Sequence, residues 1–150
     1  MTAARIRIEF AHWADISAQA ERAYPRECCG LLVGTRDPGG DVTVTRVVPS
    51  PNVARHGGFD RFEVDPQVRF DLMRELRSGA EDIVGHYHSH PDHPAKPSQT
   101  DLDLAFEPDL AWLITAVMKS DKGGSAGKTR AWKLNRDTGA IQALDLIVVE

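Results

Sequence analysis

The residues best suited to chemistry are four histidines between His86 and His93, in the segment GHYHSHPDH. In a strand, alternate residues face the same side, so His86, His88 and His90 would align. Two imidazoles at this spacing can bind one metal ion. Zinc takes imidazole and carboxylate ligands in a tetrahedral site, and a catalytic zinc site leaves one position for water. A histidine-rich loop without metal is the simpler alternative.

A serine and an aspartate follow the histidines at a fixed distance. Seven residues separate His90 from Ser98, and two more precede Asp101. Asp101 could add an oxygen ligand to the two nitrogen ligands. Ser98-x-x-Asp101 is also a helix-capping pattern, and spacing alone favours capping. Both roles are compatible, because the start of a helix would fix the direction of Asp101.

The histidine segment also contains a second metal motif. His88, His90, Asp92 and His93 match the HxHxDH string of the metallo-β-lactamase fold. Binuclear sites of that kind need histidine ligands further along the chain, and no histidine follows His93. The chain is also short for that two-sheet sandwich. We therefore interpret this match as accidental.

The pattern His88-x-His90-x7-Ser98-x2-Asp101 resembles the signature of JAMM (MPN+) metalloproteases, with the usual proline at Pro91. Upstream, residues 24–34 (YPRECCGLLVG) are similar to the family segment that carries the catalytic glutamate, in its bacterial style. Small bacterial members also carry similar residues at the positions of Asn52, Phe62, Asp65 and Pro66. The resemblance thus covers residues 14–118.

The resemblance implies a role for five residues. His88, His90 and Asp101 would bind zinc. Glu27 would be the general base on the zinc-bound water, and Ser98 would help to hold the developing oxyanion. Composition alone could not select Glu27 from 22 acidic residues. Its assignment depends on the resemblance and on the junction between a helix, Pro25 and a strand.

The implied activity is zinc-dependent hydrolysis of amide or isopeptide bonds. Small bacterial members act on ubiquitin-like sulfur-carrier proteins, trimming residues or releasing cysteine from a C-terminal Gly-Gly. We therefore expect such a carrier, or its C-terminal adduct, as the partner. The alternative is a non-catalytic MPN-type interaction module. Modules of that kind typically lose ligands, whereas this chain keeps all three. A metal-storage or sensor role is less favoured still.

Length and composition are those of one globular domain. The chain has 150 residues, 41% of them hydrophobic and 27% charged. A net charge of -4 gives no basic excess for binding nucleic acid or anionic membranes. Adjacent Cys28 and Cys29 cannot close a disulfide-bonded loop, and residues 1–10 do not resemble a signal peptide. The longest apolar-rich stretch, residues 110–118, is too short to span a bilayer. We expect a cytoplasmic protein.

Hydrophobic periodicity predicts the elements that would position these residues. Helices are predicted over residues 12–24, 66–77 and 98–104, with loops over 91–97 and 119–128. Strands are predicted over residues 5–10, 28–34, 41–49, 59–64, 82–88, 111–118, 129–135 and 141–149. The prediction is a mixed α/β domain with a central, mostly antiparallel sheet of about seven strands and two or three flanking helices. The resemblance implies a single JAMM/MPN+ domain over residues 1–150, with a cytidine-deaminase-like fold.

Overall fold

The strands pair into one sheet that closes on itself in the order β1-β3-β2-β4-β5-β6-β7. The computed structural model describes residues 4–105, 107, 109–135 and 137–150. Within these residues the strands are β1 (Arg5–Glu9), β2 (Cys29–Arg36), β3 (Val42–Ser50), β4 (Asp82–Pro91), β5 (Ala111–Ser120), β6 (Gly123–Leu134) and β7 (Ile141–Val149). Four neighbouring pairs are antiparallel and three are parallel. The predicted mixed α/β fold with seven strands is confirmed, whereas closure of the sheet was not predicted.

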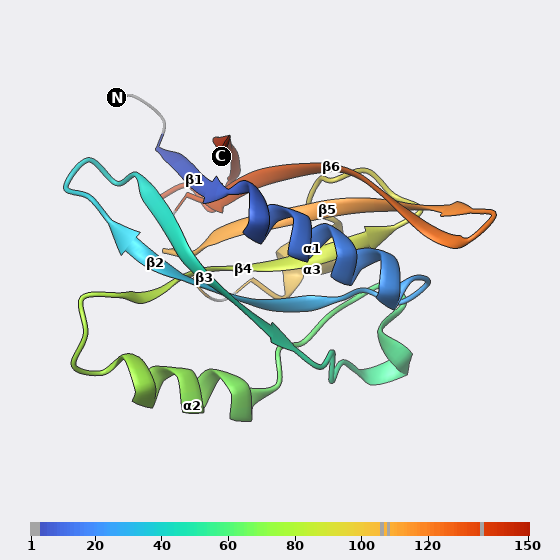
Figure 1. Ribbon diagram of the computed structural model, residues 1–150, viewed down its shortest axis with the longest axis horizontal. Helices are drawn as coiled ribbons and strands as arrows, with labels where there is room; N and C mark the ends of the chain where they lie inside the picture. Colours follow the sequence, from blue (N-terminus) through green and yellow to red (C-terminus); the bar gives the residue numbers. More distant parts are fainter. Residues whose placement is uncertain (1–3, 106, 108, 136) are drawn as a thin grey trace.

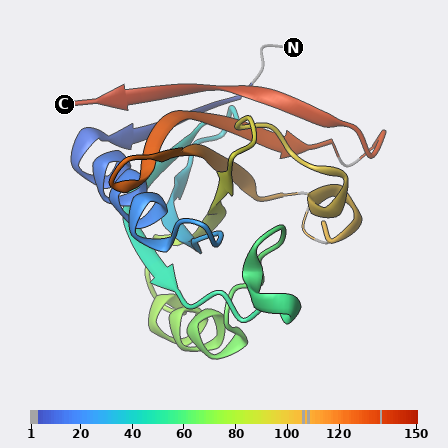
Figure 2. The same ribbon diagram turned by 90° about the vertical axis from the view of Figure 1, so that its right-hand side faces the viewer.

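Helices lie on different sides of this sheet (Figure 1). The helices are α1 (Phe10–Ala23), α2 (Pro66–Leu76) and α3 (Gln99–Asp103), and a 3-10 turn, η1, spans Arg55–Gly58. α1 buries Ile16 and Ala20 and packs mainly on β6 and β5. α2 buries Leu72. Both α2 and η1 lie below the sheet in two perpendicular views (Figure 2).

β4 is the central strand that positions the site, since it pairs with β2 on one side and β5 on the other. Tyr87 faces the core beneath α1, where its hydroxyl donates to Gln19 Oε1 over 2.6 Å. Alternation along the strand then turns His86, His88 and His90 toward the opposite face. Tyr87 therefore packs in the core and is not part of the histidine-bearing face. No helix in the described part of the chain is long and apolar enough to cross a membrane.

Two predicted elements were wrong. Residues 59–64 do not form a strand: Val64 makes only an isolated bridge with Asn52. The Asn52 side chain holds this segment by donating to Arg61 O and accepting from Glu63 N. An asparagine amide here supplies the hydrogen bonds that a neighbouring strand would have supplied.

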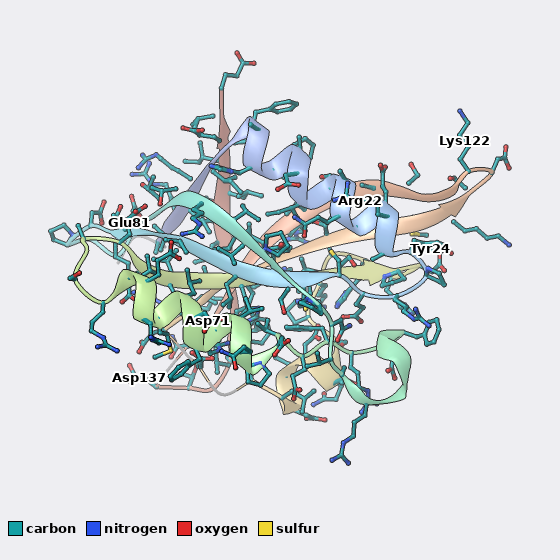
Figure 3. All side chains as sticks on the ribbon, turned by 60° about the horizontal axis from the view of Figure 1, so that its bottom comes forward. Arg22, Tyr24, Asp71, Glu81, Lys122 and Asp137 are labelled. Atoms are coloured by element: carbon teal, nitrogen blue, oxygen red, sulfur yellow. The ribbon has the colours of Figure 1, made fainter. Side chains whose placement is uncertain are left out.

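The predicted loop over residues 119–128 is mostly strand. β5 continues to Ser120 and β6 begins at Gly123, so only the tip of the hairpin turns. Figure 3 shows Lys122 at this tip. The Glu21 side chain, on α1, accepts from Ala126 N and so helps to hold the start of β6. Glycine and serine suggested a loop, but pairing between backbones does not need side chains.

Candidate metal centre

Pairing between β2 and β4 brings Glu27 to the histidines. Cys29 lies opposite His88 in this ladder. Just before it, Cys28 N donates to Ser89 Oγ over 2.8 Å, and Ser89 N donates to Cys28 O over 3.1 Å. Glu27, which directly precedes Cys28 in the chain, therefore lies beside the histidine-bearing end of β4.

The backbone of Glu27 is also fixed by Gly58, at the end of η1, and by Asn52, which precedes η1. The Glu27 amide donates to Gly58 O over 2.7 Å, and its carbonyl accepts from Asn52 Nδ2 over 3.0 Å. Neither bond involves the carboxyl group. Glu27 Oε1 is buried and has no hydrogen-bond partner among the described residues. The fold thus holds the main chain and leaves the carboxyl oxygen free to bind a ligand.

A capping box directs Asp101 toward the same point. Ser98 Oγ accepts from Asp101 N over 3.0 Å, and Ser98 N donates to Asp101 Oδ2 over 2.9 Å. The same Oδ2 lies 3.2 Å from His88 Nε2 and 2.9 Å from His90 Nε2. Helix capping and convergence with the histidines therefore occur together, as the sequence allowed.

Four side chains form the candidate metal centre: Glu27, His88, His90 and Asp101. All four are buried, and their potential ligand atoms lie within 4.8 Å of one another. The two His Nε2 atoms are 3.1 Å apart. Ligands about 2.0–2.1 Å from a tetrahedral zinc would be separated by about 3.3 Å, so the spacing fits a metal of this size.

Neighbouring groups orient the two imidazoles. His90 Nδ1 lies 2.9 Å from Pro94 O, and a proton on Nδ1 leaves the Nε2 lone pair facing the centre. The Phe62 ring stacks on His88, with ring centroids 4.2 Å apart and planes 17° apart. Neither role was predicted from the sequence. A carbonyl leaves no trace in a motif, and Phe62 had matched the family only by position.

Burial shapes the electrostatics of the centre. Burial, and then the charge of Asp101, raises the pKa of Glu27 to about 9. Burial would also raise the pKa of Asp101, but hydrogen bonds with His88 and His90 outweigh it and hold that pKa well below its usual range. Burial lowers the pKa of His88. Two carboxyl groups and two imidazoles, buried together around an unpartnered oxygen, are a donor set suited to a divalent metal.

This pKa shift predicts how the stability of the metal-free protein depends on pH. The Glu27 carboxyl ionises at about 4.5 when unfolded and about 9 when folded, so the folded state binds the extra proton between these values. Its contribution is complete below pH 4.5 and is lost as the pH rises toward 9. In chelator, the free energy of unfolding of the wild type in urea should therefore fall by up to about 1.4 kcal/mol per pH unit relative to that of Glu27→Gln. Parallel stability curves between pH 5 and pH 8 would contradict the shift.

The remaining residues of the histidine segment lie outside this centre. His86 lies between Phe62 and Trp112, with ring centroids 5.5 Å and 5.4 Å away. Asp92 accepts from the Tyr24 hydroxyl over 2.7 Å and from Lys119 N over 3.0 Å. Neither Asp92 nor His93 joins the four-residue group, which agrees with treating the metallo-β-lactamase match as accidental.

Comparison with known proteins places the chain in a family. It is 38% identical over 90 residues to the desampylase of Haloferax volcanii, covering 60% of this chain and 62% of that protein. It is 35% identical over 100 residues to the CysO-cysteine peptidase of Mycobacterium tuberculosis, covering 67% and 65%. The match thus spans slightly less than two thirds of each relative. The solution structure of a Desulfitobacterium hafniense protein superposes with a TM-score of 0.78 at 29% identity, covering 97% of this chain and 93% of that one.

The family model for prokaryotic homologs of the JAB domain, Prok-JAB, matches residues 10–135. This span includes the whole four-residue centre and the capping serine. It confirms the family resemblance drawn from residues 24–34 and from the pattern between His88 and Asp101. The chain belongs to the Prok-JAB family.

Proposed function

We propose that the protein is a zinc metallopeptidase of the JAMM/MPN+ type. It cleaves an amide or isopeptide bond at the C-terminus of a ubiquitin-like sulfur-carrier protein. The observation that carries the proposal is the buried convergence of Glu27 with His88, His90 and Asp101. In this proposal the two histidines and Asp101 hold the zinc, and Glu27 stands beside the remaining position.

The side chains divide the chemistry among them. Zinc would polarise the substrate carbonyl, lower the pKa of water toward about 7 and offset the burial that raises the pKa of Glu27. Glu27 Oε1, which has no protein partner among the described residues, accepts the proton of the attacking water and returns it to the leaving amine. Phe62 stacks on one face of the His88 ring and so helps to hold its orientation.

Ser98 stabilises the tetrahedral intermediate in this scheme. Its Oγ accepts from Asp101 N, so the hydroxyl hydrogen remains available to donate to the developing oxyanion. A donor that is already fixed by a helix cap needs little reorganisation when negative charge develops on the carbonyl oxygen.

The carrier as substrate is supported by the relatives' names. One is a desampylase and another a CysO-cysteine peptidase, and both align with this chain at 35–38% identity. We further propose that residues 1–150 form one domain with the cytidine-deaminase-like JAMM/MPN fold. A reducing cytoplasm suits its two free cysteines, Cys28 and Cys29.

Mass spectrometry of defined conjugates tests the function. A sulfur-carrier protein that bears a C-terminal cysteine, a short C-terminal extension or an isopeptide-linked lysine is incubated with the zinc-loaded protein. We expect at least one conjugate to shift to the mass of the carrier ending in Gly-Gly, and a chelator to prevent the shift. Unchanged masses for all three conjugates would contradict the proposal. If only one conjugate reacts, its linkage is the one that the enzyme prefers.

Substitutions of Ser98 should separate its capping role from its proposed catalytic role. Ser98→Ala removes both and should cost about 0.5–2 kcal/mol of stability. Ser98→Gly removes the hydroxyl but costs only a few tenths of a kcal/mol at a helix N-cap. Both variants should lower kcat by about a hundredfold. A Ser98→Gly enzyme with wild-type kcat and an unchanged melting temperature would show that Ser98 is only a cap.

A further inference from the structure

The Asn52 side chain joins two segments that border the metal centre. Its Nδ2 donates to Glu27 O and to Arg61 O, each over 3.0 Å. Its Oδ1 accepts from Ala54 N and from Glu63 N, each also over 3.0 Å. One side chain therefore makes four hydrogen bonds, all of them with backbone groups. The two bonds from Nδ2 connect the main chain of Glu27 to that of Arg61.

This set of bonds requires an asparagine. A backbone carbonyl can only accept and a backbone N–H can only donate, so the position needs two donated and two accepted bonds from one short planar group. An ionised aspartate keeps the acceptors but has no donor, and it would turn a second oxygen toward the two carbonyls. A glutamine amide would lie one methylene further out. The same pattern determines which end of the Asn52 amide is the nitrogen.

Both ends of the link reach the centre. Glu27 Oε1 has no hydrogen-bond partner among the described residues, so the main chain of Glu27 largely determines where that oxygen lies. Phe62 directly follows Arg61, and its ring stacks on His88 with centroids 4.2 Å apart. Asn52 thus sets the spacing between the main chain that carries the proposed base and the ring that packs on a proposed zinc ligand.

Gly58 completes the attachment of Glu27. Its carbonyl accepts from Glu27 N over 2.7 Å, and its φ is +73°. A Cβ added at Gly58 would lie only 2.6 Å from Asn52 Nδ2, so the Gly58 backbone and the Asn52 amide are in close contact. The amide and the carbonyl of Glu27 are therefore bonded to two groups that touch each other, and a shift of Asn52 disturbs both attachments.

We propose that Asn52 is a positioning residue for the hydrolytic reaction, and that it holds Glu27 at a fixed distance from the metal ligands. The proposal rests on the proposed hydrolase function. Asn52 lies outside the four-residue centre, so it acts through the Glu27 main chain and through Phe62. A displacement of about 1 Å in a reacting group can cost about a hundredfold in rate. The four bonds of Asn52 therefore contribute to kcat as well as to folding.

Asn52→Asp tests this role in the zinc-loaded enzyme. Aspartate keeps an acceptor for Ala54 N and Glu63 N but cannot donate to Glu27 O. On a carrier conjugate that the wild type cleaves, we expect kcat to fall about ten- to a hundredfold, with KM and zinc content unchanged. In the Glu27→Gln background the further loss should be less than about twofold, because no base remains to be positioned. Wild-type kcat for Asn52→Asp at full zinc occupancy would overturn the proposal.

Asn135 is the matched control, because it is an asparagine that holds a loop away from the centre. Its Oδ1 accepts from Asp137 N and from Thr138 N in the turn between β6 and β7. Asn52→Ala and Asn135→Ala should both lower the melting temperature, and only Asn52→Ala should lower kcat per bound zinc. If Asn52→Ala changed the melting temperature alone, Asn52 would hold its loop without positioning the base, and the proposal would be wrong.

Two neighbouring glycines supply an independent perturbation. Gly57 and Gly58 have φ values of +81° and +73°, so alanine strains the backbone at either position. A Cβ at Gly58 presses on Asn52 Nδ2, whereas the nearest atom to a Cβ at Gly57, at 2.9 Å, belongs to the half-exposed Phe59 ring. Both variants should melt at a lower temperature, but only Gly58→Ala should lower kcat. Equal kcat in the two variants would contradict transmission through Asn52.

An NMR measurement that needs no turnover separates this proposal from the function. In the zinc-loaded wild type, the stacked Phe62 ring should shift the His88 ring protons upfield, and Phe62→Leu identifies that shift. Asn52→Asp should lose part of the shift, whereas Asn135→Asp should keep all of it. Loss of the shift, with no conjugate cleaved by the wild type, would refute the enzyme and leave Asn52 as the residue that positions the centre. Hydrolysis with a kcat that does not depend on Asn52 would refute the positioning role and leave the enzyme.

Discussion

Replacing Glu27 with glutamine is expected to lower kcat by about two to four powers of ten while zinc remains bound. A positioned general base contributes this much to proton transfer, and a carboxamide cannot take its place. The loss should appear in kcat rather than KM, because the carboxyl acts on the reacting water. Rates are measured with whichever carrier conjugate the wild type cleaves. The zinc content of each preparation is measured as well.

The variant should fold normally. The hydrogen bonds that hold Glu27 use its backbone amide and carbonyl, and its Oε1 has no partner among the described residues to lose. Glutamine also resembles the protonated carboxyl that a pKa of about 9 predicts for the metal-free protein near neutral pH. Glu75→Gln is the matched control, since Glu75 lies exposed on α2, pairs with Arg46 of β3 and is far in the chain from the centre. Full kcat for Glu27→Gln, with zinc bound, would exclude Glu27 as the base.

The part of the centre that is local in sequence could be predicted from the sequence. Two histidines two apart in a strand must share a face, and a serine three residues before an aspartate predicts the capping box that aims Asp101. Both expectations need only a few neighbouring residues, and the structure contains both features.

Glu27 could not be found in this way. It precedes His88 by more than sixty residues and reaches it only because β2 pairs antiparallel with β4. No periodicity in a single sequence specifies which strands pair. The resemblance supplied the residue, and the ladder from Cys29 and His88 explains its position.

Errors in the fold prediction have the same origin. The sheet closes because β1 lies parallel to both β3 and β7, so the two ends of the described chain meet. Residues 119–128 have a loop-like composition, but the end of β5 and the start of β6 pair through their backbones. The Glu21 side chain adds a hydrogen bond that helps to hold the start of β6. Such contacts between distant segments override local propensity.

Replacing Asp101 with asparagine is expected to weaken zinc binding by about a hundredfold or more, and to lower hydrolysis in proportion at limiting zinc. Loss of an outer-shell partner already costs ten- to a hundredfold in metal affinity, and Asp101 is a proposed direct ligand. Asparagine keeps an oxygen that can accept from Ser98 N, so α3 should persist. Competition with a coloured chelator measures the affinity of each variant.

Asp103→Asn is the matched control for this change. Asp103 lies on the same short helix, accepts from Gln99 Nε2 and is outside the four-residue centre. It should bind zinc as the wild type does.

Zinc at a hundred times its Kd should stabilise the wild type by about 2.7 kcal/mol, because a ligand that binds only the folded state adds its binding free energy. The same zinc concentration should raise the melting temperature of Asp101→Asn far less. If Asp101→Asn instead bound zinc with wild-type affinity, the carboxylate would be only a helix cap, and two imidazoles would be too few ligands for the proposed enzyme.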